Sequence, residues 1–162
     1  MDFLIFISFL ITLRICELLV STKNEKWLRA NGAIEYGQKH YPSIVLLHIC
    51  FIFSLIIEYL HGTTATPDYL FLILFLVLIA VKIQVINSLG KYWNTKIFHI
   101  QGVPLIKKGL YKYFKHPNYI IVICEIVVIP LIFHLYITAI AFLLLNGIVL
   151  SIRINEENKA IS

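Results

Sequence analysis

Long apolar blocks alternate with polar stretches along this chain of 162 residues. The blocks lie at Phe3–Val20, Ser43–Leu60, Tyr69–Leu89 and Tyr119–Ile152. The hydrocarbon core of a bilayer is about 30 Å thick, and a helix needs about 20 apolar residues to cross it. Each of the first three blocks is long enough for one transmembrane helix. The pattern therefore predicts an all-α integral membrane protein.

The fourth block has 34 residues and is too long for one span. A single helix of that length would extend about 50 Å at about 1.5 Å per residue, well beyond the bilayer core. Two helices of about seventeen residues fit instead. Pro130 and the stretch His134–Tyr136 predict that the turn lies near residues 131–136. We therefore expect about five transmembrane helices, the last two forming a helical hairpin.

Lysine and arginine are distributed unevenly between the polar stretches. Residues 21–42 hold four of them, residues 61–68 hold none, and residues 90–117 hold six. Since Lys and Arg concentrate in cytoplasmic loops, the first and third stretches are expected in the cytoplasm. Five helices also place Arg153 and Lys159 on that side and the N-terminus outside. A four-helix arrangement would put this tail on the opposite side from residues 90–117.

Composition excludes several other classes of protein. Hydrophobic residues make up 59% of the chain and charged residues 14%, whereas soluble domains have about 45–50% and about 25%. The net charge of +5 follows from the Lys and Arg residues beside the spans, so no nucleic-acid partner is expected. Cys16, Cys50 and Cys124 lie in different apolar blocks and predict neither a disulfide framework nor a metal site. The histidines also lack the close spacing of metal ligands.

The chain is expected to form a single membrane domain over residues 1–162. The first apolar block has neither a preceding basic region nor a small-residue cleavage site, so we expect a permanent helix rather than a signal peptide. No internal repeat is visible in the sequence. Residues 1–89 would then contain three helices, and residues 90–162 would contain a polar region followed by the hairpin.

Two polar clusters stand at the ends of the predicted hairpin, where they would meet at one membrane face. The first is His116–Tyr119, in which Pro117 suits the first turn of a helix and the free N–H groups there can bind an anion. The second contains Arg153, Glu156 and Glu157, which share a helix face at positions i, i+3 and i+4. A capping turn with interfacial aromatic residues and a snorkelling arginine would explain the same residues without chemistry.

Charged residues also interrupt the apolar blocks. Arg14 and Glu17 are three residues apart and can pair on one helix face, either towards the bundle interior or by snorkelling to the interface. Lys82, Glu58 and Glu125 lie inside other blocks, and such charges are costly unless they face a partner or a cavity. A small non-enzymatic transporter or channel subunit with a polar path is therefore the alternative function. Transporters commonly carry repeats, which this sequence lacks.

The C-terminal third resembles the isoprenylcysteine carboxyl methyltransferase family of integral-membrane, S-adenosylmethionine-dependent enzymes. The resemblance covers roughly Leu89–Lys159, and it rests on the joint order of four elements rather than on any one of them. The family pattern has a Gly-x-Tyr element, an Arg-His-Pro-x-Tyr element, and an arginine followed by paired glutamates. The matching elements here are the Gly-Val-Pro-Leu-Ile strip of residues 102–106, Gly109–Tyr111, Lys115–Tyr119 and Arg153–Glu157.

The N-terminal half is similar to a bacterial branch of the same family. The similar elements are Arg14-x-x-Glu17, Asn24–Trp27, Gly32–Gly37 and His40–Pro42. Members of this branch accompany type III polyketide synthases and O-methylate long-chain alkylpyrones. The resemblance thus implies a multi-pass protein of the bacterial cell membrane, and the loop charges predict that its active site lies on the cytoplasmic side. The acceptor stays open among an alkylpyrone, a prenylcysteine carboxylate and a phospholipid amine, and so does the oligomeric state.

The resemblance also implies a cofactor, S-adenosylmethionine, and a set of site residues. Arg153 would face a lipophilic small-molecule substrate, and Glu156 would hold Arg153 or the methyl donor. The residues implied for cofactor binding are Val103, Pro104, Leu105, Ile106, Tyr111, His116, Pro117, Asn118, Tyr119 and Glu157. No metal is implied. Two departures from the pattern are Lys115, where the family has arginine, and Ile121, where many members have glycine.

Methyl transfer from a sulfonium needs alignment and exclusion of water more than it needs a strong base. A carboxylate or an acidic enol is already largely anionic near neutral pH, and Arg153 can hold such an acceptor with a bidentate fork. Glu157 can pair with the ammonium or hydroxyl groups of the cofactor. His116 and the start of the helix at residues 117–119 can take its carboxylate.

Overall fold

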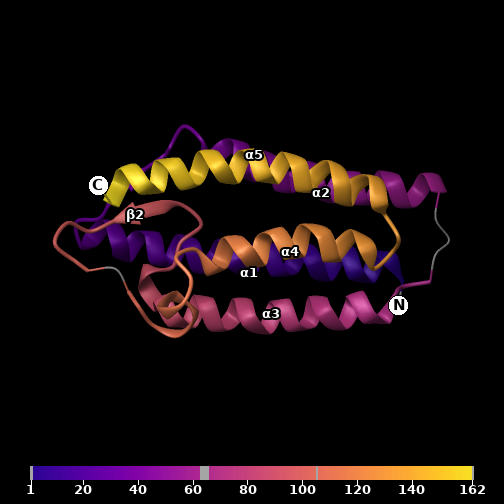
Figure 1. Cartoon of the computed structure of the whole chain (residues 1–162), viewed down its shortest axis with the longest axis horizontal. Helices are drawn as coiled ribbons and strands as arrows, with labels where there is room; N and C mark the ends of the chain where they lie inside the picture. The colour runs from indigo at the N-terminus through magenta and orange to yellow at the C-terminus, as the bar shows by residue number, and fades with distance from the viewer. Residues whose placement is uncertain (1, 63–65, 105, 162) are drawn as a thin grey trace.

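The computed structural model describes residues 2–62, 66–104 and 106–161, without the side chains of residues 160 and 161. The helices lie side by side, roughly parallel to the long axis of the molecule (Figure 1). Short strands and 3-10 turns gather at the end of the bundle that holds the C-terminus. The elements are α1 (Phe3–Ala30), β1 (Ile34–Tyr36), α2 (Tyr41–Gly62), α3 (Tyr69–Leu89), η1 (Gly90–Tyr92), β2 (Ile97–His99), η2 (Gly109–Lys112), α4 (Pro117–Leu131) and α5 (Tyr136–Ile161).

The apolar blocks predict these helices well. Helix α3 has the predicted bounds, α4 begins at Pro117, and the hairpin turn falls between Leu131 and Tyr136 as expected. In the described part of the chain, four helices are long and apolar enough to cross a membrane. Helix α4 is shorter, with 15 residues. The prediction of an all-α integral membrane protein with a C-terminal hairpin is confirmed.

One predicted boundary is wrong. Helix α1 does not end at Val20 but continues to Ala30, so the first part of the expected polar loop is helical. Residues 21–30 contain mostly good helix formers, and Glu25 accepts hydrogen bonds from Arg29 one turn away. The helix stops before Gly32, which adopts a positive φ of 77°. The polarity of residues 21–30 alone did not distinguish a solvated helix from a loop.

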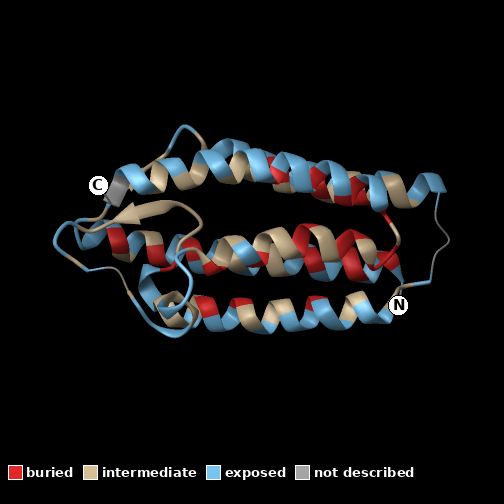
Figure 2. Ribbon diagram, viewed as in Figure 1, coloured by how far each residue is buried: buried red, intermediate tan, exposed pale blue. Residues whose placement is uncertain are grey.

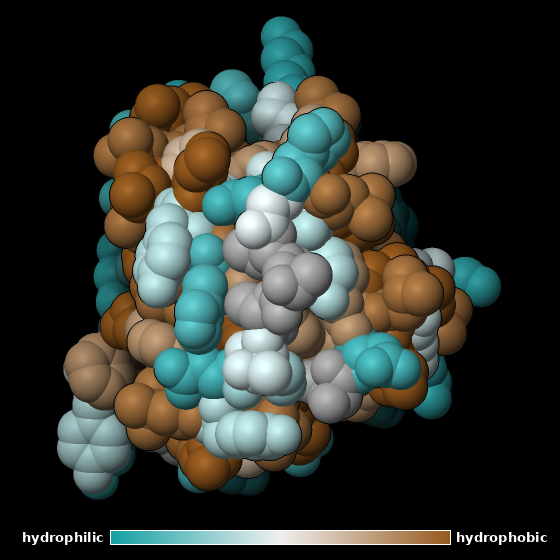
Figure 3. Space-filling model, turned by 90° about the vertical axis from the view of Figure 1, so that its right-hand side faces the viewer, coloured by the Kyte–Doolittle hydropathy of each residue, from teal (hydrophilic) through white to brown (hydrophobic). Residues whose placement is uncertain are grey.

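The apolar core lies towards the end of the bundle where the N-terminus is found (Figure 2). Phe3 stacks on Tyr59 with ring centroids 3.8 Å apart, and Phe133 of the hairpin turn packs edge-on against Phe3 and Phe6. Most other large apolar side chains point outwards, as expected for a lipid-facing surface. Figure 3 shows this end of the bundle from outside, with hydrophilic residues through the middle of the face and hydrophobic residues on both sides.

Four charged side chains form an ionic network inside the bundle. Arg14 pairs with Glu17 and Glu125, both at 2.9 Å, and Lys82 pairs with the same two carboxylates, both at 2.8 Å. The predicted pair of Arg14 and Glu17 is therefore present and faces the interior. Two cations balance two anions, and the network ties α1 to α3 and α4. Glu58 is not part of it, because its carboxylate accepts the N–H groups at the start of α5.

Replacing Lys82 with methionine is expected to destabilise the protein strongly. Removing one member of a buried ion pair leaves an uncompensated charge and costs about 3–5 kcal/mol. Thermal unfolding in detergent should show a clearly lowered midpoint for Lys82→Met. The matched control is Lys23→Met on α1, where the lysine is exposed. Equal midpoints for the two variants would contradict a stabilising role for the network.

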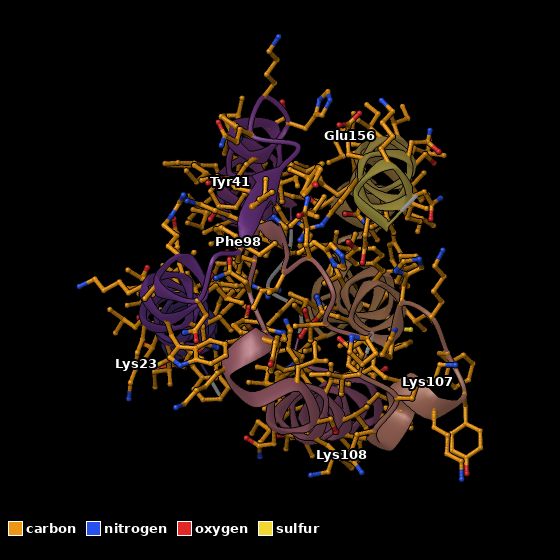
Figure 4. The ribbon with its side chains drawn as sticks, turned by 90° about the vertical axis from the view of Figure 1, so that its left-hand side faces the viewer. Lys23, Tyr41, Phe98, Lys107, Lys108 and Glu156 are labelled. Atoms are coloured by element: carbon orange, nitrogen blue, oxygen red, sulfur yellow. The ribbon has the colours of Figure 1, made fainter. Side chains whose placement is uncertain are left out.

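The opposite end of the bundle carries the loops that surround the site. Strands β1 and β2 pair antiparallel, with Glu35 opposite Phe98. Turn η2 lies against α3, where a Cβ on Gly109 would come within 2.3 Å of Ser88 Oγ. The positive φ of 58° at Gly109 also favours glycine. Figure 4 looks onto this end, with Tyr41, Phe98 and Glu156 around one part of it and Lys107 at the edge.

Candidate active site

A cavity of about 370 Å³ opens at the loop end of the bundle. Its volume lies within the range of about 300–1,000 Å³ that is usual for small-molecule sites. The wall is formed by the segment that follows α3, by η2, by the start of α4 and by the last turns of α5. The two polar clusters at the ends of the hairpin both contribute to it, so they do meet, as predicted from helix length and loop charge.

Three side chains form a continuous polar array on the cavity wall. Tyr119 donates a hydrogen bond of 2.6 Å to Glu157 Oε2, and Arg153 Nε donates one of 2.8 Å to the Tyr119 hydroxyl. Arg153 Nη2 also donates to the carbonyl oxygen of Thr95 at 2.6 Å, and the guanidinium lies over the Tyr119 ring at 5.3 Å. A cation and a carboxylate are thus held one helical turn apart, with a phenol between them.

His116 and Tyr111 stand beside this array and are neutral near pH 7. His116 stacks on Tyr119 with ring centroids 5.1 Å apart, and its Nδ1 lies 3.4 Å from Glu157 Oε2. Loss of hydration lowers the pKa of His116, and the Lys115 charge acts in the same direction, whereas Glu157 opposes it. Loss of hydration, together with Glu157, raises the pKa of Tyr111 to about 12. Neither group is therefore charged under ordinary conditions.

The lowered pKa of His116 predicts a dependence of stability on pH. Since the folded protein binds the proton more weakly than the unfolded chain, the contribution is present above the ordinary value of 6.5 and is lost as pH falls through the folded pKa. The melting temperature of the wild type should therefore fall more steeply than that of His116→Gln between about pH 7 and about pH 5. Parallel curves of melting temperature against pH for the two proteins would contradict this contribution of His116.

The apolar side of the cavity includes Val103, Pro104 and Ile106. Leu105, which the resemblance also implies, lies outside the described residues. Asn118 lines the cavity too, and its Oδ1 is buried without a hydrogen-bond partner among the described residues. A buried acceptor left in this state costs about 1–3 kcal/mol, so a ligand N–H or O–H there would be stabilising.

Pro117 and Ile121 do not line this cavity. Pro117 is buried in the first turn of α4, where its missing N–H costs no helical hydrogen bond. Ile121 lies one turn further along the same helix and is buried as well. Lys115, the other departure from the family pattern, lines the cavity and donates a single hydrogen bond of 2.7 Å to Asn158 Oδ1.

Glu156 is placed differently from the sequence-based expectation. Its Oε1 lies 2.6 Å from Lys159 Nζ and 3.8 Å from His40 Nε2, and it does not line the cavity. Adjacent residues in an α-helix point about 100° apart, since a turn contains about 3.6 residues. Arg153 and Glu157 therefore share the cavity face, while Glu156 lies beside Gly37 in the loop before α2.

The segment directly after α3 contributes side chains to the cavity that the sequence pattern did not predict. Trp93, Asn94 and Lys96 line the cavity, and Thr95 supplies the carbonyl oxygen that holds Arg153. The polar Asn-Thr-Lys run after an apolar span was a visible signal for side chains at the membrane surface. The role of the Thr95 carbonyl could not be predicted from the sequence, because every residue carries a backbone carbonyl.

The comparison with known proteins identifies the family. The isoprenylcysteine carboxyl methyltransferase (ICMT) family matches residues 71–162, which include both polar clusters and most of the cavity wall. The chain belongs to the isoprenylcysteine carboxyl methyltransferase family. As an ICMT-family protein it is a multi-pass membrane methyltransferase, and enzymes of this family generally use S-adenosylmethionine. Membership thus favours the enzyme over the transporter or channel alternative.

Two bacterial relatives of this ICMT-family chain align along almost their whole length. "Uncharacterized protein YpbQ" of Bacillus subtilis (strain 168) is 44% identical over 162 residues, covering 98% of this chain and 96% of the relative. An "Uncharacterized protein" of Haemophilus influenzae (strain ATCC 51907 / DSM 11121 / KW20 / Rd) is 30% identical over 156 residues, covering 94% and 91%. No solved structure matches the chain.

Proposed function

We propose that this ICMT-family protein transfers a methyl group from S-adenosylmethionine to an oxygen atom of a lipophilic acceptor. An alkylpyrone-like polyketide or the carboxylate of a lipidated molecule would be suitable. The observation that carries the proposal is the array of Arg153, Tyr119 and Glu157 on one cavity wall. It offers a cation for an anionic acceptor and, one turn away, a carboxylate for the cationic end of the methyl donor.

The residues present in the cavity fit S-adenosylmethionine by their chemistry. Glu157 is an acceptor for the ammonium group or for the ribose hydroxyls. Asn118 Oδ1, which has no hydrogen-bond partner in the described part of the chain, is a second acceptor. His116 and the positive end of the α4 helix dipole can bind the carboxylate. The apolar strip with Val103 and Ile106 provides a surface for the adenine ring.

The bound cofactor supplies a methyl group that is already activated by its attachment to a sulfonium. The residues of the chain then have to orient the acceptor and keep water away. Two of the hydrogen bonds of Arg153 go to Tyr119 and Thr95, which fix the guanidinium and leave further N–H donors for an acceptor oxygen. The acceptor needs no strong base, because a carboxylate or an acidic enol is largely anionic near neutral pH.

The cavity is proposed to face the cytoplasm, with the N-terminus outside. The loops that hold β1, β2 and the 3-10 turns lie at the same end of the bundle as the C-terminus, and the N-terminus lies at the other end (Figure 1). The ten Lys and Arg residues of segments 21–42 and 90–117 belong to the cavity end. The apolar tail of the acceptor would lie in the bilayer beside the helices, with its polar head in the cavity.

Product analysis tests the proposed acceptor class. Membranes with and without the protein are incubated with S-adenosylmethionine that carries an isotopically labelled methyl group, and the extracted lipids are examined by mass spectrometry. We expect a labelled lipophilic product with an O-methyl group, formed by the wild type and not by Arg153→Ala. Label on a phospholipid amine, or no labelled lipid at all, would contradict the proposal.

A further inference from the structure

Helix α1 holds the segment that follows α3 through two buried polar side chains, Ser21 and Asn24. Asn24 Nδ2 donates hydrogen bonds to the carbonyl oxygens of Gly90, at 3.1 Å, and of Trp93, at 2.7 Å. Buried polar groups are costly unless they find hydrogen-bond partners. These side chains therefore point to a specific docking of α1 onto the loop after α3.

Ser21 makes the more extensive contacts of the two. Its Oγ lies 3.0 Å from Asn94 Oδ1 and 2.8 Å from Thr95 Oγ1, and it accepts a hydrogen bond of 3.1 Å from the Thr95 N–H. Its carbonyl oxygen accepts a further bond of 2.9 Å from Asn94 Nδ2. The backbone of Thr95 is thus held directly by this one serine of α1.

Thr95 in turn holds Arg153. The Thr95 carbonyl accepts the hydrogen bond from Arg153 Nη2 at 2.6 Å, while Tyr119 holds Nε. These two anchors determine the plane of the guanidinium, which otherwise hangs on a long flexible side chain. Ser21 itself does not line the cavity, so it can influence a ligand only through its neighbours.

We propose that Ser21 is a positioning residue that sets the orientation of Arg153 through Thr95, and so tunes the affinity for the anionic acceptor. Ser21 lies outside residues 71–162, so the N-terminal part of the chain acts on the part that matches the family. The inference rests on the proposed role of Arg153 as the acceptor-binding residue. The chain of contacts runs from α1 to the loop after α3 and then to α5.

The first test measures the accessibility of the Arg153 side chain directly and needs no substrate. Phenylglyoxal modifies accessible arginines, and peptide mass spectrometry can follow Arg153 with the exposed Arg29 as an internal reference. We expect Ser21→Ala to raise the modification rate of Arg153 severalfold relative to Arg29. The matched control is Thr22→Ala, because the adjacent hydroxyl is exposed and donates its hydrogen bond within α1, to the Leu18 carbonyl.

An unchanged ratio in folded Ser21→Ala would overturn the inference, whatever the acceptor proves to be. A second variant guards against a folding defect. Asn94→Ala removes the two bonds that Asn94 makes with Ser21 and the bond that its Oδ1 accepts from the Lys96 N–H, but it leaves the direct bond from the Thr95 N–H to Ser21 in place. It should therefore raise the modification rate of Arg153 less than Ser21→Ala does, and a larger increase than in Ser21→Ala would overturn the inference.

The second test uses a long-chain 4-hydroxy-2-pyrone as the acceptor. Misplacement of a binding group by about 1 Å can cost up to about a hundredfold, so we expect Ser21→Ala to raise the acceptor KM about tenfold and to leave the Kd of S-adenosylmethionine unchanged. In an Arg153→Lys background the same change should add nothing, since the residue through which Ser21 acts is gone. Additive effects would overturn the inference. A wild type that binds the cofactor but does not methylate the pyrone would instead refute that acceptor.

Discussion

Arg153→Ala should lower turnover by about a hundredfold to a thousandfold, as the loss of one preorganised charge-stabilising donor commonly does. Arg153 is a cation on the wall of the cavity, and hydrogen bonds to Tyr119 and Thr95 fix the orientation of its guanidinium. Without it, an anionic acceptor loses its bidentate partner and its alignment with the methyl donor. Steady-state rates with a labelled methyl donor measure the effect.

Cofactor binding by Arg153→Ala distinguishes a role of Arg153 in binding the acceptor from a role in binding the methyl donor. If Arg153 binds the acceptor, Arg153→Ala keeps its affinity for S-adenosylmethionine, because Glu157 and His116 are still present. Arg153→Lys keeps the charge but loses the planar fork, so its turnover should lie between those of the wild type and the alanine variant. Loss of cofactor binding in Arg153→Ala would remove this residue from the acceptor role and place it with the methyl donor.

Glu157→Gln should weaken the binding of S-adenosylmethionine by about tenfold to a hundredfold. A hydrogen bond to a charged group is worth about 1.5–3 kcal/mol, and the substitution removes the charge that would face the ammonium of the cofactor. The geometry is otherwise kept, because glutamine can still accept the bond from the Tyr119 hydroxyl. Equilibrium binding to the detergent-solubilised protein measures the change.

The chain offers an adjacent control for this experiment. Glu156 has the same chemistry one residue earlier on α5, but it lies outside the cavity and contacts Lys159 and His40. Glu156→Gln should therefore bind the cofactor like the wild type. If Glu156→Gln loses more affinity than Glu157→Gln, the proposed face of α5 is the wrong one.

The sequence predicts those parts of the fold that depend on hydropathy and length. The apolar blocks mark α2 and α3, and the excess length of the last block predicts the hairpin turn between Leu131 and Tyr136. The end of α1 was missed because residues 21–30 are polar and yet have good helix propensity. The ionic network was predicted only as the local pair of Arg14 and Glu17, since its other links join separate helices.

In the candidate site, too, the sequence predicts what depends on local pattern and misses what depends on how the helices pack. Charge counting brought the two ends of the hairpin to one face, and the family resemblance pointed to the apolar strip around Val103. The resemblance implied Glu157 for the cofactor, but it also gave Glu156 a role at Arg153 or the methyl donor. The rotation of α5 against its neighbours decides which carboxylate lines the cavity, and it leaves Glu156 outside. The anchoring of Arg153 by Thr95 depends on a backbone carbonyl and on the docking of α1, which no local pattern records.

Binding of radiolabelled S-adenosylmethionine to the purified, detergent-solubilised wild type tests the central claim most directly. The proposed function predicts saturable binding that excess unlabelled cofactor displaces, that Glu157→Gln weakens and that Glu156→Gln leaves intact. If neither the purified protein nor membranes that contain it bind the cofactor, the cavity is not a methyl-donor site and the proposed reaction is wrong.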